Sequence, residues 1–107
     1  MTNSDYAVVI TTTDSEDKAR TLAGAVVNEK LAACAQVYSI SSVYQWQGKV
    51  EEEQEWRIDF KTRSALVDGL SSFIAEHHDY DEPEIIALPI TGGSPGYLSW
   101  VSAETRS

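Results

Sequence analysis

The sequence predicts a mixed α+β domain in which helices cover one face of an antiparallel sheet. Apolar residues recur at helical spacing in two segments, and β-rich runs stand before, between and after these segments. The connections are short, and no repeat, linker or low-complexity tract divides the chain. With 107 residues, of which 42% are apolar and 23% charged, we expect residues 1–107 to form a single globular domain.

The first two expected elements are a strand and a helix. Tyr6 to Thr12 is a β-rich run that is apolar on both faces, which is typical of a central strand. Thr13-Asp14-Ser15-Glu16 matches a capping box, and a helix is expected over roughly residues 14–30. The apolar positions of this helix recur at Ala19, Leu22, Ala23, Val26, Val27 and Leu31.

A long hairpin is expected in the middle of the chain. Apolar residues alternate first at Ala33, Ala35 and Val37 and then, on the other parity, at Tyr38, Ile40, Tyr44 and Trp46. This change of phase predicts a β-bulge or a sharp bend in the strand. A turn is expected at Gln47-Gly48-Lys49. The return strand alternates cleanly, with Trp56, Ile58 and Phe60 on one face and Arg57, Asp59 and Lys61 on the other.

A second helix and a fourth strand complete the sheet. Helical spacing from Leu66 to His77 predicts a helix that begins near Ser64 and ends before Pro83. Glu84 to Thr91 is the fourth strand, and Pro95 is the expected first residue of a short final helix. The order β-α-β-β-α-β, followed by a helix, is that of the ferredoxin-like split βαβ arrangement.

The long central hairpin also predicts an oligomer. Each arm reaches about 14 residues, or roughly 46 Å, whereas a compact domain of this length has a radius of gyration near ~13 Å. Part of the hairpin, which carries Tyr44, Trp46, Val50 and Trp56, therefore projects beyond its own core. A neighbouring subunit would cover these side chains and pair the free strand edges, and cyclic symmetry would close the assembly.

Composition argues against several classes of partner. The net charge is −9, from 17 acidic and 8 scattered basic residues, so the basic stripe that nucleic acid or an anionic membrane requires is missing. The longest apolar runs, Tyr6–Ile10 and Ile85–Ile90, are too short to span a bilayer. The single cysteine, Cys34, allows no internal disulfide, and we expect no signal peptide at residues 1–5. These features predict a cytoplasmic protein.

Several segments of the chain stand together in a distinctive order. They are Lys30–Ala35, Ser42–Lys49, Glu55, Phe60–Thr62, His77–Ile85, Leu88–Ile90 and Tyr97–Trp100. In this order and spacing the chain resembles the CutA divalent-cation-tolerance family, from Val8 to Trp100. The resemblance implies a ferredoxin-like subunit in a PII-like homotrimer that is built by intersubunit β-pairing. It also implies a role in tolerance of divalent metals, copper in particular, because some members of the family bind copper.

The candidate metal ligands are His77, His78 and Cys34. Imidazole suits copper, zinc and nickel, and the acids that surround the two histidines would add oxygen ligands. Adjacent residues on a helix point about 100° apart, so both rings share one ion only if the helix ends between them or the ion lies between subunits. The alternative roles are structural: His77 follows the apolar spacing of the helix, one histidine caps the helix C-terminus, and Cys34 is a small buried side chain.

A second set of candidates would line a cleft at the subunit interface, and it comprises Trp46, Glu55, Lys61, Tyr80 and Glu84. Glu55 matches a position of the family and, with Lys61, forms either a ligand site or a fixed intersubunit ion pair. Tyr80 and Glu84 are polar groups at the start of an apolar strand, so they need hydrogen-bond partners. They either satisfy each other or a neighbouring residue, or they bind a ligand. Trp46 is more simply a packing anchor.

These observations predict a divalent-cation, and specifically copper, tolerance or response protein that acts as a homotrimer. The alternative is a PII-like trimeric sensor with a small-molecule site at the subunit interface. Neither hypothesis includes catalysis, since the sequence displays no Ser/His/Asp, Cys/His or P-loop constellation. No cofactor is expected to be obligatory, and copper(II) or another divalent ion is the expected ligand.

Overall fold

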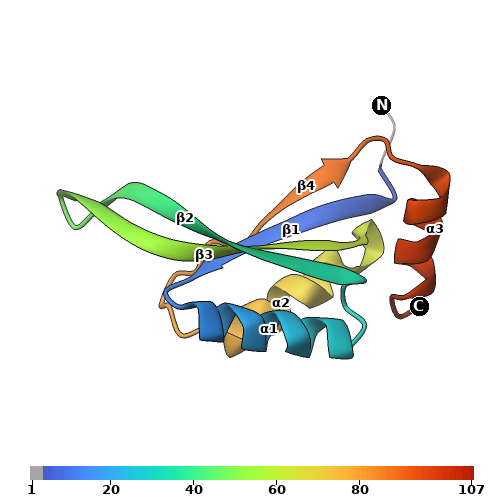
Figure 1. Ribbon diagram of the computed structural model, residues 1–107, viewed down its shortest axis with the longest axis horizontal. Helices are drawn as coiled ribbons and strands as arrows, with labels where there is room; N and C mark the ends of the chain where they lie inside the picture. Colours follow the sequence, from blue (N-terminus) through green and yellow to red (C-terminus); the bar gives the residue numbers. More distant parts are fainter. Residues whose placement is uncertain (1–3) are drawn as a thin grey trace.

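The computed structural model describes residues 4–107 as a four-stranded sheet with helices on one face (Figure 1). Its elements are β1 (Tyr6–Thr13), α1 (Glu16–Asn28), β2 (Cys34–Trp46), β3 (Lys49–Arg63), α2 (Val67–His77), β4 (Ile86–Ile90) and α3 (Pro95–Ala103). Residues 1–3, part of the segment in which no signal peptide is expected, lie outside the described residues. Within residues 4–107, no helix has both the length and the apolar character needed to cross a membrane.

The strand order β2-β3-β1-β4, with every neighbouring pair antiparallel, is that of the ferredoxin-like fold, so the predicted fold class is confirmed. β1 lies between β3 and β4, as its two apolar faces predict. α1 and α2 lie side by side under one face of the sheet (Figure 1). The core lies between this face and the helices. It includes Val9, Ile58 and Phe60 of the sheet, Val26 of α1 and Ile74 of α2.

The start of α1 differs from the predicted capping box. Ser15, in an extended conformation, is the N-cap, and its hydroxyl accepts a hydrogen bond from the backbone N–H of Lys18 at 3.1 Å. Thr13 is still the last residue of β1, and its hydroxyl donates to the carbonyl of Ser15 at 2.8 Å. The prediction was wrong by two residues because both serine and threonine suit this role, and the paired length of β1 decides which one is free to cap.

α1 ends at Asn28, two residues before the expected boundary, because the chain reverses at Lys30. Lys30 has a positive φ of 58°, and the backbone N–H of Leu31 donates back to the carbonyl of Val26 at 3.2 Å. This is the pattern of a Schellman C-cap, in which glycine is the usual residue. The carbonyl of Lys30 in turn accepts from the backbone N–H of Arg106 at 2.9 Å, which ties the C-terminal segment to this turn.

The hairpin is long, as predicted, but it contains no bulge. β2 and β3 pair one-to-one without interruption from Cys34↔Lys61 to Trp46↔Lys49. The prediction of a β-bulge was therefore wrong, and the alternative of a sharp bend stays a prediction. The apolar parity changes because the helices cover only the first part of β2, where Val37 faces the core. The side chains of Tyr38, Ile40, Tyr44 and Trp46 project from the opposite face.

Two residues connect the arms of the hairpin. Gln47 and Gly48 both have positive φ angles, 50° and 80°, which is the signature of a type I′ turn. This turn matches the twist of the strands and fixes their register. The hairpin extends well beyond the ends of α1 and α2 (Figure 1). Its tip is exposed in the single subunit, and the side chain of Trp46 retains 54% of its accessible surface.

The remaining elements close one end of the sheet. α2 follows a single 3-10 turn at Ser64–Leu66, so a helical turn begins at the predicted residue. α3 begins at Pro95, as predicted, and lies across the end of the sheet at which β1 starts (Figure 1). The hydroxyls of Tyr6 and Ser102 lie 2.6 Å apart and join this helix to β1.

Among residues 4–107, no helix or second sheet covers the face of the sheet opposite α1 and α2, and we call this face the open face. Register places Ile86 opposite Ile10 and Leu88 opposite Val8 on this face. Ile86 and Leu88 are 47% and 50% exposed. β4 is shorter than the predicted strand from Glu84 to Thr91, because Glu84 and Ile85 belong to the connection that follows α2.

Candidate functional site

The connection from α2 to β4, residues 78–85, passes around the end of β1, and we call it the strap. His78 ends α2 because its backbone is extended, with φ −91° and ψ 145°. Its ring is 1% exposed and uses both nitrogens. Nε2–H donates to the carbonyl of Thr12 at 2.7 Å, and Nδ1 accepts from the backbone N–H of Tyr80 at 3.1 Å. This pattern fits the neutral tautomer with its proton on Nε2.

Tyr80 of the strap contacts the base of the hairpin. Its phenol donates a 2.9 Å hydrogen bond to Oε2 of Glu55, which is only 8% exposed. β1 ends at Thr13, which pairs with Trp56. Glu55, the next residue of β3 toward the hairpin tip, therefore has no partner on β1. The strap occupies the place that β1 vacates. Burial, and then the bond to Glu55, raise the pKa of Tyr80 well above its usual range, so the phenol stays a proton donor.

A short ion-pair network ties the strap to α1. Nζ of Lys18 lies 2.5 Å from Asp79 and 2.9 Å from Asp14. The bond to Asp79, followed by the bond to Asp14, raises the pKa of Lys18 to about 12. The same bond to Lys18 lowers the pKa of Asp79. These side chains are about half exposed, so solvent screens the network, and its role is to orient the strap more than to stabilise the fold.

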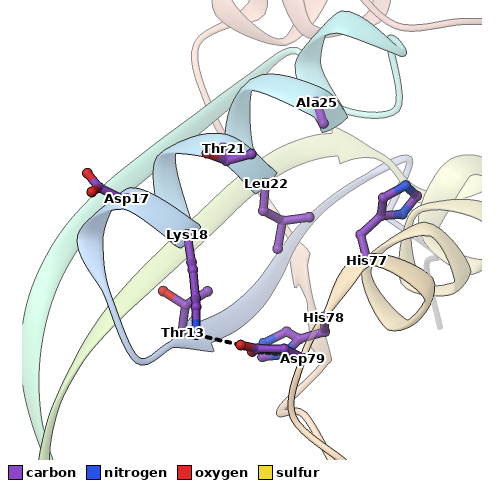
Figure 2. A pocket seen from close by; sticks show the side chains of 9 residues that line it. All are labelled: Thr13, Asp17, Lys18, Thr21, Leu22, Ala25, His77, His78 and Asp79. Carbon is purple, nitrogen blue, oxygen red and sulfur yellow. Dashed lines mark hydrogen bonds and ion pairs between the residues drawn. The ribbon is translucent and has the colours of Figure 1, made fainter.

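A groove of about 350 Å³ lies between α1 and the end of α2 (Figure 2). Leu22 and Ala25 of α1 supply apolar surface, and Lys18 and Asp79 close one end. Figure 2 shows His77 at the end of α2, on the side of the groove opposite α1. The groove therefore belongs to the helical layer, on the other side of the sheet from the open face.

The two histidines diverge at the point where α2 ends. His77 is exposed, stacks on Phe73 with ring centroids 4.0 Å apart, and directs Nδ1 to the carbonyl of Phe73 at 2.8 Å. His78 is buried and has no ring nitrogen left for an ion. Over residues 4–107, no three His, Cys, Asp or Glu side chains are grouped closely enough to hold a metal. A metal site at His77 and His78 stays a prediction, and within one subunit only Nε2 of His77 is unoccupied by a described partner.

Cys34, the third candidate ligand, lies near the other end of the sheet. It pairs with Lys61, which pairs with Val8 near the start of β1, whereas His78 contacts Thr12 near the end of that strand. Its Sγ lies 3.4 Å from the phenolic oxygen of Tyr97. This contact, together with burial, raises the pKa of Tyr97 to about 12. Cys34 therefore shares no intrasubunit site with the histidines.

Comparison with known proteins identifies the family. The CutA1 divalent ion tolerance protein family matches residues 7–104. The chain belongs to this family. The CutA protein of Arabidopsis thaliana, which is described as chloroplastic, is 45% identical over 101 residues, or 94% of this chain. The divalent-cation tolerance protein CutA of Yersinia pestis is 40% identical over the same share of the chain and 85% of its own length.

The crystal structure of CutA1 from Oryza sativa has the same fold. It superposes with a TM-score of 0.93 at 42% identity, and covers 99% of this chain and 98% of the rice chain. The family resemblance read from the sequence is thus confirmed. The chain spans only 56% of the length of the Arabidopsis relative.

The interface candidates are only partly brought together in this CutA1 family member. Glu55 and Tyr80 are in contact, whereas Lys61 is six residues farther along the same face of β3, or roughly 20 Å away. Lys61 instead donates to the side-chain carbonyl of Gln36 on β2. Trp46 lies at the hairpin tip, remote from all of these residues. A cleft that includes Lys61 and Glu55 together would need a second subunit.

Sequence reasoning missed a polar cluster on the open face. Arg57 donates to Asp59 at 3.1 Å and lies 5.9 Å from the ring of Tyr38, whose hydroxyl donates to Asp59 at 3.0 Å. Mainly the bond to Asp59 raises the pKa of Arg57, and the exposed carboxylate of Glu84 adds a smaller effect. The signal was the alternation of charged residues along β3, which placed Arg57 and Asp59 on one face but assigned them no role.

Proposed function

We propose that this chain acts in tolerance of, or response to, divalent cations as a cytoplasmic homotrimer that binds copper(II) or a similar ion. Membership of the CutA1 divalent ion tolerance protein family supports the general role. The proposed role is one of binding, with no catalytic step. The homotrimer, the metal ligand and the compartment are proposals that extend beyond family membership.

The open face is the observation that carries the assembly. The apolar residues Ile86 and Leu88 of this face remain about half exposed, which is unfavourable in water, and burial gains roughly 25 cal/mol for each Å² of apolar surface removed. The projecting hairpin adds Val43, Trp46 and Val50, each more than half exposed. Both surfaces need cover, and copies of the same chain that pack open face to open face would supply it.

A metal site would need ligands from more than one subunit. A single subunit presents one available imidazole nitrogen, Nε2 of His77, whereas copper(II) prefers several nitrogen or oxygen ligands. Symmetry would multiply each ligand, but His77 lies in the helical layer, so a site at His77 would need an intersubunit contact outside the open face. Cys34, in contrast, lies on the open face, among residues that would meet across subunits.

The test is a calorimetric titration of metal-stripped protein with copper(II), with zinc and magnesium as comparison ions. His77→Phe keeps the stacking on Phe73 and removes Nε2, while Cys34→Ser tests the thiol. His78→Ala is included with a melting temperature, because loss of its two hydrogen bonds would also disturb the strap. Submicromolar copper binding with simple stoichiometry, lost in one of these variants that still folds, supports the metal role.

Weak and unsaturable uptake of all three ions would contradict the metal role, because it would reflect only attraction of cations to a chain with a net charge of −9. It would leave the homotrimer untouched, since the oligomeric state is measured separately. The titration thus separates metal binding from assembly.

The second candidate is a PII-like sensor with a small-molecule site between subunits. One observation favours it: the strap holds Tyr80 against the buried carboxylate of Glu55, beside the Arg57–Asp59 cluster. Such a set of fixed donors and charges at the rim of an apolar face suits recognition of an organic ligand. A sensor would retain its trimer and bind copper only weakly, and ligand-induced changes would appear at Tyr80 and Glu84.

A further inference from the structure

A pocket of about 370 Å³ lies between the last turn of α1 and α3, and we call it the α1–α3 pocket. Its volume falls in the range of small-molecule sites, which is roughly 300–1,000 Å³. No lining residue belongs to a strand, to the strap or to the candidate metal ligands, so this pocket lies outside both proposed roles. The lining residues are Val27, Asn28, Lys30, Ala33, Trp100 and Glu104.

Hydrogen bonds to the backbone fix the walls of the α1–α3 pocket. The backbone N–H of Arg106, just after α3, donates to the carbonyl of Lys30 at 2.9 Å. Nε of the Arg106 guanidinium donates to the carbonyl of Glu29 at 3.0 Å. These bonds attach the end of α3 to the turn after α1, so the pocket is formed before a ligand arrives. A preformed site orders fewer groups on binding, which favours affinity.

Part of the lining is apolar and aromatic. Trp100 and Val27 are 41% and 37% exposed, and Ala33 adds a small buried side chain. The face of an indole ring carries partial negative charge and attracts polarised C–H groups. An exposed tryptophan therefore offers a flat platform for a ring that presents C–H bonds on one face, as the pyranose form of a sugar does.

The rest of the lining is polar and carries balanced charge. Lys30 and Glu104 have opposite charges, and Asn28 adds a neutral amide. Among residues 4–107, these three side chains have no hydrogen-bond or ion-pair partner, whereas the neighbouring Glu29 and Arg106 form an ion pair at 3.8 Å. Together they offer both donors and acceptors, which adjacent hydroxyl groups require because each hydroxyl donates and accepts.

These two parts of the lining determine the chemistry of the ligand. An organic ion would match one charge and leave the opposite charge unmatched, and a hydrocarbon would leave all three polar side chains without a partner. A neutral ring with several hydroxyls and one C–H face satisfies the whole lining. We propose that the α1–α3 pocket binds a hexopyranose, which stacks on Trp100 and directs its hydroxyls to the three polar side chains.

The test is an NMR titration of the full-length, ¹⁵N-labelled native protein with methyl β-D-glucopyranoside. Sorbitol, which has the hydroxyls without the ring, and cyclohexanol, which has a ring with a single hydroxyl, serve as comparison ligands. We expect saturable shifts of the indole N–H of Trp100 and of the backbone amides of Lys30 and Ala33. The dissociation constant should be on the order of 1 mM for a ligand of this size. The comparison ligands should bind at least about tenfold more weakly.

D-glucose, titrated in parallel, distinguishes the source of the ring. Equal affinity for the two sugars would indicate a site for the free hexose, whereas preference for the methyl glycoside would indicate a site for the end of a glycoside. Both results support recognition of the ring itself.

Two variants and one control complete the experiment. Trp100→Leu should abolish saturable binding, because it removes the platform and keeps a residue that suits a helix. Glu104→Ala, at the exposed end of α3, should weaken the glucoside by roughly two- to tenfold, as the loss of a hydrogen-bond acceptor predicts. Ser99→Ala, at an exposed position of α3 outside the pocket, should leave the affinity unchanged.

The proposal would be overturned if neither sugar produced saturable shifts, or if the shifts mapped outside the pocket. Equal affinity for glucoside and either comparison ligand would overturn it as well. An unchanged affinity in Glu104→Ala would have the same meaning, and this variant remains decisive if Trp100→Leu fails to fold. None of these outcomes depends on copper binding or on the oligomeric state.

Discussion

The phenolic oxygen of Tyr80 lies 2.9 Å from Oε2 of Glu55, and this pair joins the strap to the base of the hairpin. The pairing of β3 with β1 ends at Trp56, and Glu55 is the next residue toward the hairpin tip. Without Tyr80, the buried carboxylate of Glu55 would lose its hydrogen-bond partner. The pair therefore stabilises the hairpin at the point where it leaves the body of the subunit.

Tyr80→Phe should destabilise the protein by about 1–3 kcal/mol, because it leaves a buried acceptor unsatisfied while removing little apolar contact. Glu55→Gln should cost less, because the amide oxygen still accepts from the phenol. The measurement is urea-induced unfolding at a fixed protein concentration. The double variant should cost less than the sum of the two single variants, and strict additivity would show that the pair does not act as a unit.

The fold was predictable because local signals agreed with one another. The helical spacing of Leu22 and Val26 and the alternation of Ile58 and Phe60 each reflect burial on one side of an element. The errors arose where one signal has two causes. A change of apolar parity after Val37 indicates either a bulge or a change in which face is covered, and only the extent of the helices along β2 distinguishes them.

The candidate site was predictable only in part. Tyr80 and Glu55 were selected separately, and their contact depends on how far β1 extends along β3, which no local pattern encodes. The roles of Lys18 and Asp79 were missed, because they are 61 residues apart in sequence and meet only through the path of the strap. Lys61 was grouped with Glu55 through the family resemblance. That resemblance implies a cleft between the subunits of an assembly, and it does not imply a contact within one subunit.

Ser15→Ala should destabilise the protein by about 1 kcal/mol, because the N–H of Lys18 loses its capping acceptor. Ser15→Asp should restore most of this loss, since aspartate caps well and suits the positive end of the helix dipole. Thermal unfolding of the three proteins at equal concentration is the measurement. If Ser15→Ala has the same melting temperature as the native protein, Ser15 does not stabilise the helix as its N-cap.

Lys30→Gly should stabilise the protein by about 0.5–1 kcal/mol. Lys30 adopts a left-handed conformation, with φ of 58°, that glycine accepts without strain. Its backbone contacts with Val27 and Arg106 do not involve the side chain and should persist. Asn28→Gly, two residues earlier and at the last position of α1, is the matched control and should destabilise. A lower melting temperature for Lys30→Gly would contradict the prediction.

The contact between Lys18 and Asp79 should weaken in acid. Lys18 lowers the pKa of Asp79 below its ordinary value of about 3.9. A depressed carboxyl pKa contributes stability that is present above the unfolded value and is lost as pH falls through the folded value. An NMR titration of the Asp79 carboxyl should therefore show a midpoint below 3.9. Lys18→Met should raise this midpoint, and an unchanged midpoint would exclude the ion pair as its cause.

Leu88→Glu should abolish the proposed trimer without unfolding the subunit. Leu88 is 50% exposed on the open face, so a glutamate there is solvated in an isolated subunit, whereas burial between subunits would remove its charge from water without a partner. Light scattering coupled to gel filtration should give the mass of three chains for the native protein and of one for the variant, with helical circular dichroism retained. Ala75→Glu, at an exposed position of α2, should remain a trimer. A variant Leu88→Glu that still assembles would show that the open face is not the contact, and the projecting hairpin alone would then have to carry the assembly.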